Sequence, residues 1–99
     1  MVEVIFASEK LKRCYEASAV ASRHWGAQVA HKYISRINAL YAARAFSDLF
    51  LIKSFRLHQL KGGRQGQYAI TLLGRWRLVL VRVEEDVVRV EEVTNHYGD

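Results

Sequence analysis

The sequence is poor in the residue types on which several protein classes depend. Its 99 residues include one cysteine, Cys14, and no proline. A single thiol cannot form an internal disulfide or a zinc site built from several cysteines, so neither a disulfide-stabilised secreted fold nor a zinc finger is expected. A reducing compartment, the cytoplasm, is therefore the expected location.

Long hydrophobic runs are also missing. No apolar stretch reaches the ~18 to 20 residues that a membrane helix needs. The first residues carry an acid, Glu3, where a signal peptide has basic residues. We therefore expect no membrane partner and no export. With 51% hydrophobic and 25% charged residues, the chain is apolar enough for one core and too short for two, which predicts a single domain over residues 1–99.

Acidic residues are absent from one long segment. The formal net charge is +5, and residues 53–82 contain basic side chains but no Asp or Glu. The basic residues of this segment are Lys53, Arg56, Lys61, Arg64, Arg75, Arg77 and Arg82. Solvation of a small sheet would explain some of these cations, but their segregation favours a polyanionic partner.

The first half of the chain has helical periodicity after one short strand. Residues 2–6 read as a strand, and Ser8 is positioned to cap the helix that follows and that Gly26 would end. A second helix is predicted from Ala27 by an apolar stripe that reaches Tyr41. The basic residues assigned to the solvent side of this helix are Lys32, Arg36 and Arg44.

After a local turn at residues 46–49, the period changes from helical to alternating. Residues 55–58 read as a strand, with Phe55 and Leu57 on one face and Arg56 and His58 on the other. Glycines at 62, 63 and 66 break this run. Further strands are predicted over residues 68–73, 75–84 and 87–94.

The strand over residues 75–84 has two different faces. Trp76, Leu78 and Leu80 alternate with Arg75 and Arg77. If the bulkier apolar set packs on the helices, with Trp76 in the core, both arginines stand on the opposite side together with Arg56 and His58. The alternation thus predicts a cationic, solvent-accessible sheet face.

No familiar catalytic motif accompanies this face. The four histidines have no partner at metal-ligand spacing, and the glycines lack the Lys-Ser/Thr of a phosphate-binding loop. The remaining Arg, Lys, His and Tyr side chains suit stabilisation of an anion. RNA cleavage through its own 2′-hydroxyl needs a base, a cation at the phosphate and an acid. This chemistry requires no metal and no cofactor.

Four short motifs carry a family resemblance. They are Leu57-His58-Gln59-Leu60-Lys61-Gly62, Gly66-Gln67-Tyr68-Ala69-Ile70, Gly74-Arg75-Trp76-Arg77-Leu78 and Val93-Thr94-Asn95-His96-Tyr97. In this order and spacing the chain resembles the HigB-type, plasmid-maintenance-killer branch of the RelE/ParE toxins. The resemblance implies an α+β, RelE-like fold in which two N-terminal helices pack on a curved, mainly antiparallel sheet of four to five strands.

The resemblance also implies roles for individual residues in a ribosome-dependent endoribonuclease that cuts mRNA in the A site. His58 stands at the family's catalytic histidine, and Arg77 would stabilise the pentacovalent phosphate. His96 or Tyr97 would transfer a proton or stack on a base. The residues expected to bind RNA are Lys53, Arg56, Lys61, Arg64 and Arg75.

The partners that the resemblance implies are the ribosome, mRNA and a HigA-like helix-turn-helix antitoxin. The complex of toxin and antitoxin would bind operator DNA through the antitoxin. Two alternatives stay open. ParE-like proteins share the fold but poison DNA gyrase by protein contact and need no acid–base residues. Asn95, at a position where HigB relatives carry an acid, also allows a degenerate, weakly toxic member.

Overall fold

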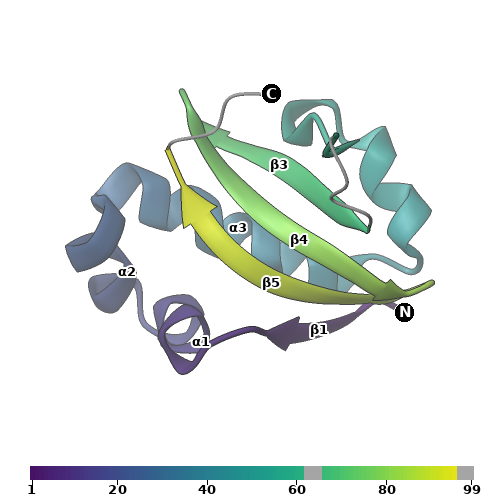
Figure 1. Ribbon diagram of the computed structural model, residues 1–99. Coiled ribbons are helices and arrows are strands. Elements are labelled where there is room, and N and C mark those ends of the chain that lie inside the picture. The colour runs from purple at the N-terminus through teal and green to yellow at the C-terminus, as the bar shows by residue number, and fades with distance from the viewer. Residues whose placement is uncertain (62–65, 96–99) are drawn as a thin grey trace.

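A five-stranded sheet forms the centre of the computed structural model, which describes residues 1–61 and 66–95. Its strands are β1 (Glu3–Phe6), β2 (His58–Gln59), β3 (Gln67–Leu73), β4 (Trp76–Glu84) and β5 (Val87–Thr94). They lie in the order β1-β5-β4-β3-β2, and only β1 and β5 pair in parallel. Helix α3 (Ala27–Ala42) crosses behind the sheet in Figure 1, and no helix of the described residues lies over the near face.

The segment expected to form the first helix forms two, α1 (Glu9–Glu16) and α2 (Ser18–Trp25). As predicted, the Ser8 hydroxyl caps α1, accepting a hydrogen bond from the Leu11 N–H at 3.2 Å. The extended backbone of Ala17 (φ −139°, ψ 110°) separates the two helices. This break allows both Cys14 on α1 and Ala21 on α2 to be fully buried. Gly26 ends α2 with φ +86°, a conformation that favours glycine.

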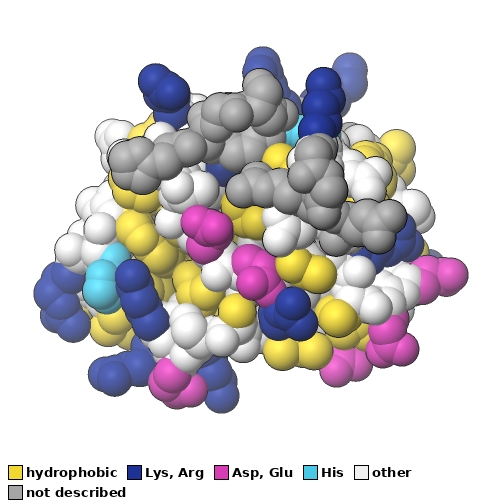
Figure 2. Space-filling view, viewed as in Figure 1, with side chains coloured by type: hydrophobic (Ala, Val, Ile, Leu, Met, Phe, Trp, Pro, Cys, Tyr) yellow, Lys and Arg dark blue, Asp and Glu magenta, His cyan; other side chains and the backbone are white. Residues whose placement is uncertain are grey.

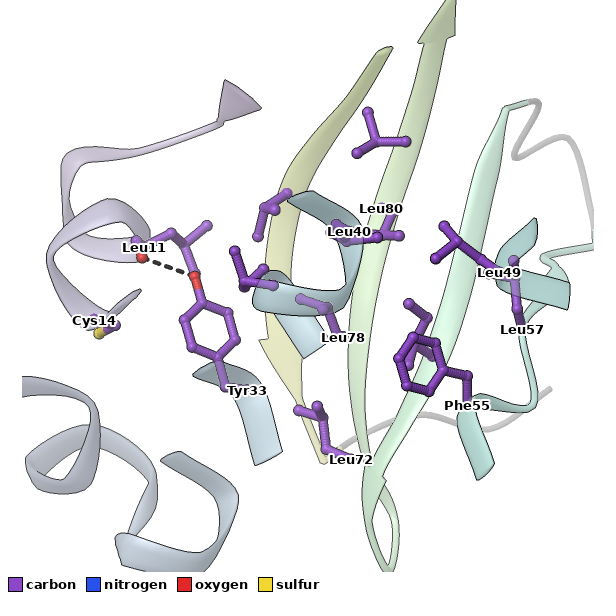
Figure 3. Close-up of a cluster of buried hydrophobic side chains, with 14 of the residues drawn as sticks. Leu11, Cys14, Tyr33, Leu40, Leu49, Phe55, Leu57, Leu72, Leu78 and Leu80 are labelled. Atoms are coloured by element: carbon purple, nitrogen blue, oxygen red, sulfur yellow. Dashed lines mark hydrogen bonds between the residues drawn. The ribbon is translucent and has the colours of Figure 1, made fainter. Parts of the chain in front are cut away.

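The helices and one face of the sheet enclose the main core, which we call the helix-side core. Sheet residues Ile70, Leu78 and Leu80 meet Tyr33 and Leu40 of α3 in this cluster. Figure 3 shows the labelled side chains converging between the helices and the strands. The Tyr33 hydroxyl, fully buried, donates a hydrogen bond to the Leu11 carbonyl at 2.7 Å. The predicted α+β class, with a mainly antiparallel sheet of four to five strands, is confirmed.

The region between α3 and β3 is less regular than the alternation predicted. Residues 46–49 lie in a 3-10 helix, η1 (Phe46–Leu51), and η2 (Lys53–Phe55) follows it. The expected strand over residues 55–58 begins only at His58, because Arg56 adopts the left-handed conformation (φ 48°, ψ 42°) that turns the chain. The predicted sidedness survives, since Phe55 and Leu57 are buried while Arg56 is exposed.

The prediction that Arg36 faces solvent is wrong. Arg36 lies on the buried stripe of α3 beside Tyr33 and Ile37 and is only 8% exposed. Its Nε donates to the Thr71 carbonyl of β3 at 3.2 Å, and its guanidinium lies 4.8 Å from the centre of the Phe55 ring. By helical periodicity residue 36 lies at the edge of the apolar stripe. The prediction placed it toward solvent because arginine is charged, whereas the structure buries it.

The last three strands agree closely with the sequence. β5 matches its predicted bounds, and β3 and β4 are joined at Gly74, whose φ of +55° allows the tight turn. Arg75 belongs to this turn, so β4 begins at Trp76. Trp76 is half-buried and packs against the helix-side core, which agrees with the prediction that its face of the strand packs on the helices.

Candidate functional site

The register of three neighbouring strands decides which side chains share the face without helices, here called the open face. His58 pairs with Ala69, and Ala69 pairs with Val79. Two residues along the same strands, Thr71 pairs with Arg77. Directly paired residues point to the same side of a sheet, as do residues two apart on one strand. His58 and Arg77 therefore lie on the same face, as the sequence predicts.

Three small or medium apolar side chains form the floor of this face. Leu60, Ala69 and Val79 make a buried cluster of their own, separate from the helix-side core. Leu60 is held beside β3 by a hydrogen bond from its N–H to the Gln67 carbonyl at 2.9 Å. His58 and Arg77 thus share the open face with this small apolar cluster.

His58 is oriented by the left-handed turn that precedes it. Its Nδ1 lies 2.8 Å from the carbonyl oxygen of Arg56. A carbonyl only accepts hydrogen bonds, so Nδ1 carries the proton in this contact. In the neutral ring Nε2 is then the basic nitrogen. The ring is half-buried, and its tautomer is set by the backbone.

Arg77 is anchored at the hairpin between β3 and β4. Its Nη1 donates to the carbonyls of Gly74 at 2.7 Å and of Trp76 at 2.9 Å. The side chain is half-buried, and these contacts direct its end toward the hairpin. Standard strand spacings put the Cα atoms of His58 and Arg77 about 12 Å apart, two strands across and two residues along. A bound polyanion could contact both side chains at once.

The open face also carries an acidic residue that strand alternation does not predict there. Glu92 of β5 pairs with Val79, so its exposed carboxylate shares the face with His58 and Arg77. Simple alternation from the buried Val88 and Val90 would send residue 92 into the core. A bulge between the pairs Leu80–Val90 and Val79–Glu92 reverses its side. Neighbouring Glu91 forms an ion pair with Arg89.

The face that the sequence predicts to be cationic therefore also carries an acid, since Glu92 shares it with Arg77. Figure 2 looks onto this side and shows hydrophobic side chains across its middle with acidic groups among them, and Lys and Arg mainly toward the rim. Arg82, from the acid-free segment, belongs to the other side of the sheet. Its guanidinium lies 4.4 Å from the centre of the Phe46 ring, and its Nε donates to the Glu85 carbonyl at 2.8 Å.

The predicted RNA-binding cations occupy turns and short helical segments rather than strand positions. Lys53 lies in η2, Arg56 in the turn before β2, Lys61 directly after Leu60, and Arg75 in the hairpin; all four are exposed. The predicted residues Arg64, His96 and Tyr97 lie outside the described residues.

Two features are absent from residues 1–61 and 66–95. Within these ranges no group of three or more His, Cys, Asp or Glu side chains is arranged to hold a metal ion. None of the helices there has the length and apolar character to cross a membrane.

Comparison with known proteins identifies the architecture. No protein-family model and no curated protein matches the chain in sequence. A crystal structure of a YafQ mutant from E. coli superposes with a TM-score of 0.66 at 14% identity, covering 97% of this chain and 94% of that one. The chain has a RelE-like toxin fold. At this identity the likeness establishes the fold alone.

Two other solved structures share the architecture over nearly their whole length. The YoeB–YefM complex from Staphylococcus aureus matches with a TM-score of 0.54 at 16% identity, covering 98% of this chain and 99% of that chain. The YoeB/ParE toxin from Agrobacterium tumefaciens matches with a TM-score of 0.56 at 15% identity, covering 97% and 100%. Both matches therefore cover nearly the whole of this chain.

Proposed function

We propose that this protein is the toxin of a type II toxin–antitoxin system, of the HigB-type branch, and that it cleaves mRNA in the ribosomal A site. The observation that carries the proposal is the register that brings His58 and Arg77 to one open face. The four motifs shared with HigB-type toxins support it, as does a fold shared with the YoeB/ParE toxin.

His58 would act as the general base. The contact from Nδ1 to the Arg56 carbonyl leaves the proton-accepting role to Nε2. That nitrogen would remove the proton of the ribose 2′-hydroxyl while the 2′-oxygen attacks the adjacent phosphorus. The bond from phosphorus to the 5′-oxygen then breaks, which gives a 2′,3′-cyclic phosphate and a 5′-hydroxyl. The substrate supplies its own nucleophile, so the scheme calls for no metal.

Arg77 would stabilise the extra negative charge of the pentacovalent phosphate. A guanidinium stays charged at every working pH and matches two phosphate oxygens at once. Its Nη1 contacts to the hairpin carbonyls hold the side chain on the open face before substrate binds. Contacts of this kind commonly rearrange when the substrate complex forms, and RNA would exchange carbonyl contacts of Arg77 for phosphate contacts.

The departing 5′-oxygen needs a proton, for which the resemblance nominates His96 or Tyr97. The exposed Lys53, Arg56, Lys61 and Arg75, together with Arg64, would hold neighbouring phosphates of mRNA or ribosomal RNA. Glu92 would oppose RNA close to the floor, which restricts the favourable path of the strand to the side carrying His58.

A HigA-like antitoxin would be the second partner, and the complex would bind operator DNA through that antitoxin. One structural neighbour, YoeB, was solved in complex with YefM, which supports a protein partner for this fold. The proposed reaction and its targets place the protein in the cytoplasm.

Inducible expression tests the proposal. The wild type is expected to stop growth, and primer extension on a reporter mRNA in a translating extract should show cuts in one reading-frame phase only when ribosomes are present. His58→Ala and Arg77→Ala should each lower the cleavage rate by about 100-fold or more, because they remove the base and the phosphate cation. His24→Ala and Arg23→Ala are matched controls on the exposed side of α2 and should cleave normally.

Other outcomes would replace the proposal. Undiminished toxicity of both site variants, with intact mRNA and an SOS response, would favour the ParE-like gyrase inhibitor. Normal growth during wild-type expression would indicate the degenerate, weakly toxic member that Asn95 suggests.

A further inference from the structure

Arg36 is the buried charged side chain of the described residues, and its surroundings are unusual for a charge. It is 8% exposed, and burial lowers the pKa of its guanidinium below the ordinary arginine value. Among the described residues no carboxylate forms an ion pair with it. An apolar side chain of similar length would fill this space at lower cost, since a buried charge without an opposite charge is expensive.

The two groups that Arg36 contacts belong to different elements, strand β3 at the edge of the sheet and the 3-10 helix η2. β2 pairs with β3 only at Tyr68 and Ala69, so no described strand lies beside Thr71 on that edge. The Arg36 Nε donates to the Thr71 carbonyl there, at 3.2 Å. The same guanidinium lies over the Phe55 ring, 4.8 Å from its centre, where the ring's negative face attracts the cation.

Each of these two contacts is made with a residue close to a proposed active-site residue, in sequence or across the sheet. Phe55 ends η2 and is followed by Arg56, whose carbonyl holds Nδ1 of His58. Thr71 is the register partner of Arg77. Phe55 is buried in the helix-side core, and Figure 3 shows its ring beside β3 next to Leu57. One side chain from α3 therefore touches both the segment that presents His58 and the strand residue opposite Arg77.

We propose that Arg36 is a positioning residue that fixes the His58 segment relative to the Arg77 strand by bridging the Phe55 ring and the Thr71 carbonyl. As a statement about catalysis this rests on the proposed function. β2 does not reach Thr71, so among the described residues no backbone pairing joins the His58 segment to β3 at that level. The Arg36 guanidinium connects the two segments there instead. Loss of the bridge should loosen the Arg56 carbonyl and release the ring that it orients.

The test measures the tautomer of the His58 ring directly. Nitrogen-15 NMR of the imidazole reports which ring nitrogen carries the proton, and it does so whether or not the protein is a nuclease. Wild type should show predominantly the tautomer with the proton on Nδ1. In Arg36→Met the two ring-nitrogen shifts should move toward each other as the tautomers mix. Ile37→Val, a buried change on the same helix that leaves both contacts of Arg36 intact, should leave them unchanged.

The cleavage assay provides a second measurement of the effect of Arg36→Met. Arg36→Met should lower the cleavage rate by about 10- to 100-fold, because a small misplacement of a catalytic group is enough for such a loss. RNA affinity should stay within about twofold, since the buried Arg36 does not reach the surface that RNA would contact. Phe55→Leu, which removes the ring but remains apolar, should change the His58 shifts in the same direction as Arg36→Met.

Three outcomes are decisive. A folded Arg36→Met protein whose His58 shifts coincide with those of the wild type overturns the positioning role. If Arg36→Met does not fold, Phe55→Leu decides in the same way, since it removes the aromatic end of the bridge and wild-type His58 shifts would again contradict the proposal. Absence of ribosome-dependent cleavage by the wild type would instead overturn the proposed function. The NMR result would then still show whether Arg36 positions the His58 ring.

Discussion

The two faces of the sheet are made by the same strands and are stabilised in different ways. Toward the helices, Ile70, Leu78, Leu80 and Val90 are fully buried in a large cluster completed by α1, α2 and α3. Toward the open side, the described residues form a much smaller buried cluster of Leu60, Ala69 and Val79. Polar residues surround that small floor. Stability is thus concentrated on one face, which leaves the other able to carry charged groups for binding.

The largest expected effect compares the same substitution on the two faces. Val90→Ala removes two methyl groups from the helix-side core and should lower the free energy of unfolding by about 2 to 3 kcal/mol, including the cavity left behind. Val79→Ala removes the same atoms from the open-face floor and should cost about 1 kcal/mol, because this cluster is much smaller than the helix-side core and can collapse more easily around the lost methyl groups. Urea denaturation of both variants measures the difference. Equal losses would show that the two faces are packed alike.

A second prediction concerns the polar group inside the helix-side core. Tyr33→Phe removes the hydrogen bond from the Tyr33 hydroxyl to the Leu11 carbonyl and should lower the free energy of unfolding by about 1 kcal/mol. Thermal denaturation at neutral pH would show it as a lower Tm. An unchanged Tm would mean that this contact adds nothing to the packing of α1 on α3.

The same residue makes the stability of the helix side depend on pH. Burial, with smaller contributions from Cys14 and Tyr41, raises the pKa of the Tyr33 phenol above its ordinary value. A raised folded-state pKa contributes stability that is present below the unfolded value of about 10 and is lost as the pH rises above it. Wild type should lose more stability between pH 10 and pH 12 than Tyr33→Phe, in denaturation series at each pH. Parallel losses would contradict this assignment.

The smallest expected effect lies on the open face. Glu92→Gln removes an exposed carboxylate beside Val79 and should change the free energy of unfolding by less than about 0.5 kcal/mol. RNA binding should become a few-fold tighter at low salt, since a repulsive charge is lost. Fluorescence titration with a short single-stranded RNA at two salt concentrations tests this. Glu16→Gln on α1 is the matched control, and weaker binding by Glu92→Gln would indicate that the carboxylate helps to hold the RNA.

The sequence predicted more of the scaffold than of the site. The helix over residues 27–42 and the strand over residues 87–94 have strong periodic patterns and were located correctly. The common face of His58 and Arg77 also follows from strand alternation. Strand alternation could not show that Arg56 and Arg75 lie in turns, because each turn depends on backbone conformations at one or two residues.

Side-chain period, turn glycines and the Ser8 cap were sufficient to establish the class of fold and the helix-facing side of β4, because these features are local and repeat along the chain. The tertiary structure alone decided the side on which Glu92 lies, because a bulge depends on how β5 aligns with β4. It also decided the burial of Arg36, since a guanidinium can enter the interior only where a carbonyl and an aromatic ring meet it. Those two partners lie 35 and 19 positions away in the sequence, and only folding brings them to Arg36.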